Sequence, residues 1–192
     1  MAAIEDKIIG DSVSSRYRIG VWVFLAAIAM MFTSLSSAYI VRAGSAGDWY
    51  PLAMPRAILV STALILISSG TFEMAKRKVN ADLRSAYLKW LLLTALFGVA
   101  FLGSQIIAWR QLAAQGIFLS SNPHSSFFYL LTATHGLHLL GGLAAVAFLL
   151  IRSQRSQVIS ERRRAAIDAV SIYWHFMDAL WIYLFLLLFL WR

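Results

Sequence analysis

Six ionisable side chains interrupt stretches of sequence that are otherwise apolar: Glu73, His135, His138, Asp168, His175 and Asp178. His135 and His138 are three residues apart, as are His175 and Asp178, so each pair shares one face of a helix. An ionisable group inside a membrane span is costly and indicates a functional site by default. Imidazole and carboxylate groups can bridge helices, relay protons or bind metals. These six residues therefore form a candidate polar intramembrane cluster.

The depths of two of these residues favour a contact between helices. Counted at 1.5 Å per residue from the inner ends of their apolar runs, Asp178 lies about 15 Å deep and His138 about 18 Å deep. Because the two runs are consecutive, we expect an Asp178–His138 hydrogen bond that clamps the two helices together. A lipid-related or proton-related role at an interface with a partner is the second interpretation.

A metal or haem site is the third interpretation, and the spacing disfavours it. Two haem-ligating imidazoles must face each other across the iron, whereas His135 and His138 share a helix and His175 is offset from His138 by about 8 Å. Zinc or copper would need three ligands at one level, and the chain has no cysteine. We therefore predict no metal ligand and no catalytic residue. His124, which precedes the fourth apolar run, is predicted to be a solvated loop residue.

Composition and length predict the elements that hold these residues. The chain has 192 residues, of which 60% are hydrophobic and 14% are charged, and its mean hydropathy is +0.70. Soluble domains are about 45–50% apolar and about 25% charged, so this composition excludes a disordered chain and indicates a bilayer. Five apolar runs each approach the length that a helix needs to cross the hydrocarbon core. They span residues 18–41, 56–75, 87–109, 126–151 and 168–191.

The predicted fold is all-α, a polytopic membrane protein with a bundle of five transmembrane helices. Only helices and closed barrels span lipid, and these runs lack the alternation of barrel strands. Residues 17–192 would form the membrane domain and residues 1–16 a polar N-terminal segment. The sequence contains no phosphate-binding or hydrolase motif. Its spans also lack the mid-depth breaks that are common at transporter sites.

Basic residues predict the orientation of the chain in the membrane. Of the 17 Lys and Arg residues, 13 lie in the N-terminal segment and in the loops 76–89 and 152–167, on one side of a five-span chain. Cytoplasmic loops are enriched in Lys and Arg, so we predict a cytoplasmic N-terminus and a periplasmic or outside C-terminus. Topology and attraction to anionic lipid account for the net charge of +8, and no nucleic-acid partner is expected.

Two motifs in the last two runs resemble one family. Residues 134–142, THGLHLLGG, resemble the H-G-L-H-V-x-x-G helix of subunit III of haem–copper oxidases. Residues 171–181, SIYWHFMDALW, are similar to the terminal Y-W-H-F-V-D-x-x-W helix of the same subunit. Weaker similarity within 19–26, 68–71 and 101–109 extends the resemblance over about residues 16–191. The chain thus resembles the five-helix prokaryotic form of the cytochrome c oxidase subunit III family.

The resemblance implies a non-catalytic integral membrane subunit of an aerobic, proton-translocating respiratory oxidase. In this family, subunit III binds no haem or copper, because the redox centres lie in subunits I and II. It packs on subunit I, binds phospholipid, and supports proton uptake and the stability of the complex during electron transport to oxygen. Arg152 and Trp174 are the candidate lipid-binding residues. The implied location is the inner or plasma membrane of a prokaryotic cell, as a multi-pass protein.

Three departures from the family pattern limit which roles of the family's residues can be assigned to this chain. Ile28 replaces the buried glutamate that is linked to proton uptake, Ala108 replaces a second glutamate, and Asp168 replaces the glutamate that opens the last helix. The proton-antenna role of the buried glutamate therefore does not transfer to this chain. The alternatives are an accessory subunit of a quinol oxidase or nitric oxide reductase, and a small proton-coupled transporter that uses the histidine–aspartate cluster.

Overall fold

Five helices make up most of the protein that the computed structural model describes: α1 (Ala2–Ser45), α2 (Ala57–Asn80), α3 (Arg84–Ala114), α4 (Pro123–Arg155) and α5 (Glu161–Leu190). The described residues are 2–45, 47, 49–50, 54–81, 83–155 and 160–190, with side chains from residue 18 onward except at 80 and 155. Within these ranges no residue belongs to a β-strand. The prediction of an all-α protein is confirmed.

All five helices are long and apolar enough to cross a membrane, which confirms the predicted five spans. Their ends differ from the predicted apolar runs, because α5 begins at Glu161 rather than at residue 168, and α1 begins at Ala2. Hydropathy marks the part of a helix inside the hydrocarbon, whereas backbone hydrogen bonds continue into the polar interface. The predicted end of the last run, residue 191, lies outside the described residues.

The connection between α3 and α4 contains the residues that end one helix and begin the next. Gly116 has a φ of 75°, the left-handed conformation that ends many helices, and its amide donates to the carbonyl of Ala113. Pro123 opens α4, where its missing N–H costs nothing. Asn122 caps this helix by accepting a hydrogen bond from the amide of Ser125 at 2.9 Å. Local sequence therefore determines both ends.

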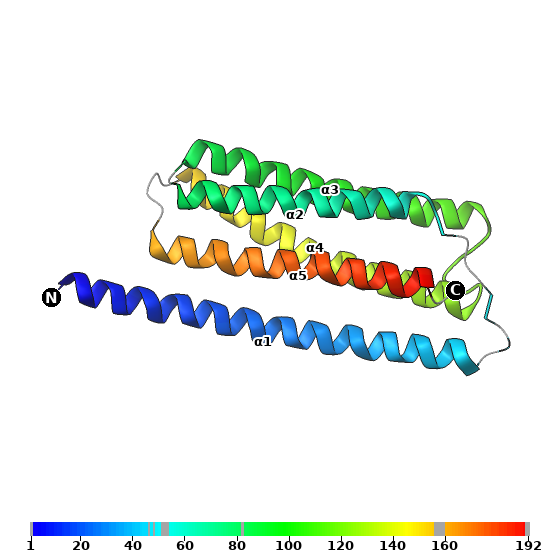
Figure 1. The fold of residues 1–192 in the computed structure, drawn as a ribbon. Coiled ribbons are helices and arrows are strands. Elements are labelled where there is room, and N and C mark those ends of the chain that lie inside the picture. The colour runs from blue at the N-terminus through cyan, green and yellow to red at the C-terminus, as the bar shows by residue number, and fades with distance from the viewer. Residues whose placement is uncertain are drawn as a thin grey trace.

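Helices α2, α3, α4 and α5 form a ring, and α1 lies outside it (Figure 1). The most extensive contact is between α2 and α3, and the ring closes through α3–α4, α4–α5 and α5–α2 contacts. Helix α1 packs on α5 and, over a smaller area, on α4. Helices α4 and α5 therefore each contact three other helices, and α5 makes the larger contact with α1.

Trp174 of α5 fills the centre of the ring and is fully buried. Phe72 of α2 stacks on it with 6.1 Å between ring centroids. A Cβ added to Gly98 of α3 would lie 3.0 Å from the indole, and one added to Gly142 of α4 would lie 3.3 Å from it. Glycine at these two positions therefore makes room for the indole between three helices, as small residues do in membrane bundles.

Candidate functional site

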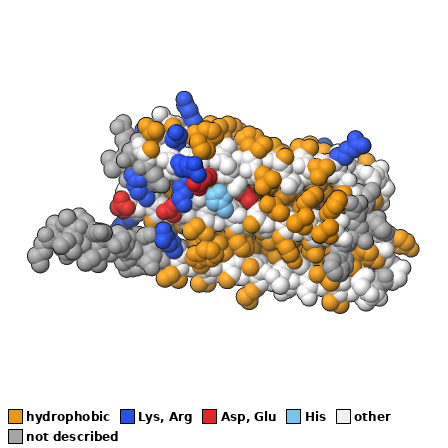
Figure 2. Space-filling view, viewed as in Figure 1, with side chains coloured by type: hydrophobic (Ala, Val, Ile, Leu, Met, Phe, Trp, Pro, Cys, Tyr) orange, Lys and Arg blue, Asp and Glu red, His pale blue; other side chains and the backbone are white. Residues whose placement is uncertain are grey.

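A row of polar side chains follows the contact between α2 and α5. We call it the polar seam, and it consists of Ser69, Glu73 and Lys76 on α2 with Asp168, His175 and Asp178 on α5. Their spacing keeps the members from each helix near one face. Figure 2 shows charged side chains gathered toward the N-terminal end of one face of the molecule, and hydrophobic side chains over much of the rest.

At mid-length of α2 and α5, His175 of the polar seam joins the two helices. Its Nδ1 lies 2.7 Å from Ser69 Oγ and 3.9 Å from Asp178 Oδ2. The Asp178 carboxylate also lies beside Ser69, but within the described chain neither of its oxygens has a hydrogen bond of standard geometry. In a hydrolytic triad the serine and the aspartate bind opposite nitrogens of the imidazole. Here both lie at Nδ1, so the group is not built to activate a serine nucleophile.

Toward the N-terminal end of α5, two ion pairs neutralise the charges of the polar seam. Lys76 Nζ lies 3.0 Å from Asp168 Oδ1 and joins α2 to α5. Arg77 Nε donates to Glu73 Oε1 at 3.1 Å within α2. Glu73 and Lys76 also lie close enough to His175 to interact with it electrostatically. The polar seam thus runs from paired charges near the helix ends to a less completely bonded group at mid-length.

The two remaining predicted residues lie elsewhere, on α4. His135 is fully buried, with its ring centroid 5.7 Å from that of Phe101 and 5.2 Å from that of Trp181. Neither of its nitrogens has a hydrogen-bond partner among the described residues. His138 Nδ1 lies 2.8 Å from the carbonyl oxygen of Thr134 in its own helix. Four of the six predicted residues are therefore brought together and two are not.

The predicted hydrogen bond between Asp178 and His138 does not form between these two described side chains. His138 bonds within α4, whereas Asp178 lies beside Ser69 of α2. A hydrogen bond between α5 and α4 is made instead by Tyr173, whose hydroxyl donates to the backbone oxygen of His138 at 2.7 Å. The prediction was wrong because depth along a helix does not determine the direction in which a side chain leaves it.

His124 belongs to a buried cluster at the end of the bundle opposite the N-terminus, so the prediction of a solvated loop residue was wrong. Its Nε2 lies 3.2 Å from the hydroxyl of Tyr39, and its Nδ1 lies 3.2 Å from the carbonyl oxygen of Tyr50. The ring stacks on Trp49 with 4.9 Å between centroids. The sequence signal for this was Pro123, which begins a helix and places the next residue in its first turn.

The two candidate lipid-binding residues lie in different environments. Trp174 is fully buried in the ring, so it does not face lipid, contrary to the prediction. Arg152 is exposed near the end of α4, with its guanidinium carbon 5.8 Å from the ring centroid of Phe148. Of these two residues, Arg152 is therefore the exposed one.

An apolar groove lies between α1, α4 and α5. Its volume is about 350 Å³, and its lining is Val21, Phe24, Gly141, Ala145, Ala169, Val170 and Tyr173. Arg152 follows Ala145 by two helical turns, about 10 Å along the same face of α4. The groove and the arginine thus present an apolar surface with a cation beyond one end.

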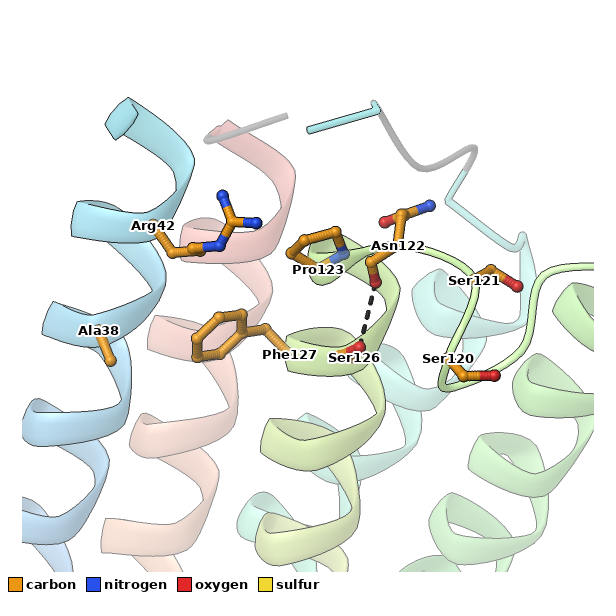
Figure 3. Close-up of a pocket in the computed structure, with 8 residues that line it drawn as sticks. All are labelled: Ala38, Arg42, Ser120, Ser121, Asn122, Pro123, Ser126 and Phe127. Carbon is orange, nitrogen blue, oxygen red and sulfur yellow. Dashed lines mark hydrogen bonds between the residues drawn. The ribbon is translucent and has the colours of Figure 1, made fainter. Parts of the chain in front are cut away.

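A more open cavity of about 670 Å³ lies at the opposite end of the bundle, between α1 and the start of α4 (Figure 3). Arg42 of α1 extends toward Pro123 across its mouth, and the hydroxyl of Ser126 donates to the carbonyl of Asn122 at 3.1 Å. None of the described lining residues is acidic or a histidine. This cavity therefore offers hydrogen bonds and one cation, but no acid–base pair.

Comparison with known proteins identifies the family. A family model described as cytochrome c oxidase subunit III matches residues 5–192. A probable cytochrome c oxidase subunit 3 from Nocardia farcinica is 37% identical over 172 residues, which cover 87% of this chain and 84% of that protein. The cytochrome bo(3) ubiquinol oxidase subunit 3 of Pseudomonas putida is 31% identical over 175 residues, covering 90% and 84%. The chain belongs to the cytochrome c oxidase subunit III family.

Subunit III is a non-redox part of haem–copper oxidases, so this chain is a subunit of an oxidoreductase complex. Within the described ranges, no three His, Asp or Glu side chains are arranged to hold a metal ion. Two of the three positions where the family pattern has glutamate are apolar and buried here, with Ile28 at 3% and Ala108 at 0% exposure. The polar seam is therefore the principal ionisable feature of the described spans in this subunit III.

Proposed function

We propose that the chain is the non-catalytic subunit III of an oxygen-reducing terminal oxidase in a prokaryotic cell membrane. It packs on subunit I of a complex whose haem and copper are held by subunits I and II. The observation that carries the proposal is the family match, which spans residues 5–192 and reaches all five helices. Within the complex, the subunit stabilises the assembly and supports proton uptake during turnover.

The distribution of basic residues supports a cytoplasmic N-terminus for this subunit. Helices α2 and α4 end, and α3 and α5 begin, at the end of the bundle where α1 begins (Figure 1). The loops 76–89 and 152–167 at that end are rich in Lys and Arg. Because cytoplasmic loops carry an excess of these residues, this end faces the cytoplasm.

The electron donor of the complex is either cytochrome c or a quinol. Relatives of both kinds match this chain, since the Nocardia farcinica protein is named for cytochrome c and the Pseudomonas putida protein for ubiquinol. The higher identity and the wording of the family model favour cytochrome c. A quinol oxidase is therefore the second candidate.

Purification of the tagged chain in mild detergent tests the proposal. We expect haem-bearing subunits to co-purify and the complex to consume oxygen with reduced cytochrome c. A haem-containing complex that uses only quinol would establish the second candidate. A complex that reduces nitric oxide instead of oxygen, or a chain that purifies without any haem protein, would overturn the proposal.

Phospholipid binding is part of the proposed function. The apolar lining and the volume of about 350 Å³ of the groove between α1, α4 and α5 support binding of an acyl chain, and the exposed Arg152 would pair with a phosphate at the inner membrane surface. We expect Arg152→Gln to lower the phospholipid retained by the purified complex, measured by mass spectrometry of extracts. Arg162→Gln, at another exposed arginine of the same end, is the matched control. Equal retention in both variants would contradict the lipid site.

A further inference from the structure

Ser69, His175 and Asp178 of the polar seam form a group at mid-length of the membrane-spanning helices α2 and α5. His175 is the fifteenth of the 30 residues of α5, so it lies about 21 Å from each helix end. Ser69 is the thirteenth of the 24 residues of α2, about 17 Å from each end. Asp178 lies one turn from His175 toward the C-terminal end of α5. These distances place the group away from both polar interfaces.

The same group reaches the outer surface of the subunit. The side chain of His175 is 38% exposed, and that of Asp178 is 5% exposed beneath it. Among the described residues, helix α1 packs on α5 and α4 and makes no contact with α2, the other helix of the polar seam. Figure 2 shows histidine and acidic side chains open on one face, with Lys and Arg side chains on their N-terminal side and hydrophobic ones toward the opposite end of the molecule.

Hydrocarbon is an unfavourable neighbour for such a group. Acyl chains offer neither donors nor acceptors, and ionisable side chains inside membranes almost always face protein or a water-filled cavity. The ion pair between Lys76 and Asp168 satisfies the inner end of the polar seam, but the Asp178 oxygens have no hydrogen bond of standard geometry within the described chain. The side chains of the polar seam that still lack hydrogen bonds therefore lie at mid-depth.

We propose that the polar seam is the surface through which this subunit III docks on a transmembrane helix of another oxidase subunit. That helix presents a hydrogen-bonding side chain at mid-depth, opposite the exposed imidazole of His175, behind which Asp178 is buried. This inference rests on the proposed function, because docking requires an oxidase complex. It goes further by naming the face of the subunit that makes the contact.

The surroundings of the polar seam suit the close approach of a helix. Gly70 follows Ser69 on α2, and a Cβ built on it would meet no atom within 4 Å. Ala179 is an exposed small residue next to Asp178 on α5. Leu66, one turn from Ser69, is 49% exposed and supplies apolar contact area. Small residues beside a polar group are typical of helix–helix interfaces in membranes.

Site-specific photo-cross-linking in the assembled complex tests the proposed surface. The probe is p-benzoylphenylalanine, placed in native membranes at Leu66 beside the polar seam or at Val99 on α3 as the matched control. Val99 is 58% exposed and also lies at mid-helix. We expect the probe at position 66, and not at 99, to form an adduct with a haem-bearing subunit, identified by mass spectrometry.

The outcomes separate this inference from the proposed function. An intact haem-containing complex with no protein adduct at position 66, or with an adduct to a second copy of this chain, overturns only the docking surface. If no haem protein accompanies the chain, both fail.

Substitution of His175 provides a second test that does not depend on the probe. We expect His175→Leu to lower recovery of the subunit with the complex about three- to tenfold, the effect of losing one interhelical hydrogen bond. His175→Gln keeps hydrogen-bonding capacity and should restore recovery, with unchanged haem spectra in both variants. Equal recovery of the two variants would contradict the docking surface.

Discussion

Two histidines of α4 are both fully buried, yet they interact with their surroundings in opposite ways. His124 makes hydrogen-bond contacts with Tyr39 and with the backbone of Tyr50, and so ties α4 to α1 and the segment after it. His135 contacts aromatic rings only, and no described residue bonds to its nitrogens. A buried polar group without a partner is costly, whereas one with partners contributes net stability.

Leucine at these two positions should therefore have opposite effects. His124→Leu removes two hydrogen bonds and should lower the free energy of unfolding by about 1–3 kcal/mol. His135→Leu removes an unbonded imidazole of similar volume and should leave the free energy of unfolding within about 1 kcal/mol or raise it. Thermal unfolding of the purified subunit, followed by tryptophan fluorescence, measures both. Equal destabilisation by the two variants would contradict this assignment.

At the scale of elements, α5 is the helix around which the ring is assembled. Its indole at Trp174 lies against Phe72 of α2 and above glycines of α3 and α4. Close packing of this kind takes the place of the hydrophobic effect, which does not drive helices together inside lipid. The glycines are required by the fit around the indole rather than by backbone conformation.

Adding one methyl group at the contact with Trp174 should destabilise the ring. Gly98→Ala would place a Cβ 3.0 Å from both the indole and Leu143, and overpacking of this kind costs about 1–3 kcal/mol. Gly103→Ala, on the same helix, has nothing within 4 Å of the new Cβ and should be neutral or stabilise the helix by up to about 1 kcal/mol, because alanine has the higher helix propensity. Unfolding midpoints in detergent compare the two. A midpoint for Gly98→Ala as high as that of Gly103→Ala would contradict the packing argument.

For the whole molecule, the four-helix ring with α1 outside it leaves two surfaces of different character. One is the apolar groove beside α1, and the other is the polar seam between α2 and α5. A subunit that must meet both lipid and protein partners uses surfaces of both kinds. The orientation of the bundle decides which leaflet each part faces.

Labelling with a membrane-impermeant maleimide tests the orientation, because the chain has no cysteine of its own. We expect Ser120→Cys, in the exposed α3–α4 connection, to be labelled in intact cells. Arg162→Cys, exposed near the start of α5, should be labelled only after the cells are opened. The reverse pattern would place the N-terminus outside and contradict the orientation derived from the basic loops.

The sequence alone determined the number of spans, their approximate positions and the family. These follow from local properties, since the free energy of placing a segment in lipid depends on that segment and the motifs lie within single helices. It also indicated most of the polar seam, because Asp168, His175 and Asp178 recur at helical spacing.

Only the tertiary structure decided which side chains meet. Asp178 lies by Ser69 instead of His138, His124 is buried, and Trp174 is in the core instead of at the lipid surface. In a soluble helix, the apolar stripe shows which face is buried. In a membrane helix, lipid-facing and core-facing residues are both apolar, so the pattern gives depth but not direction. The direction of each side chain is set by packing between helices that are distant in sequence.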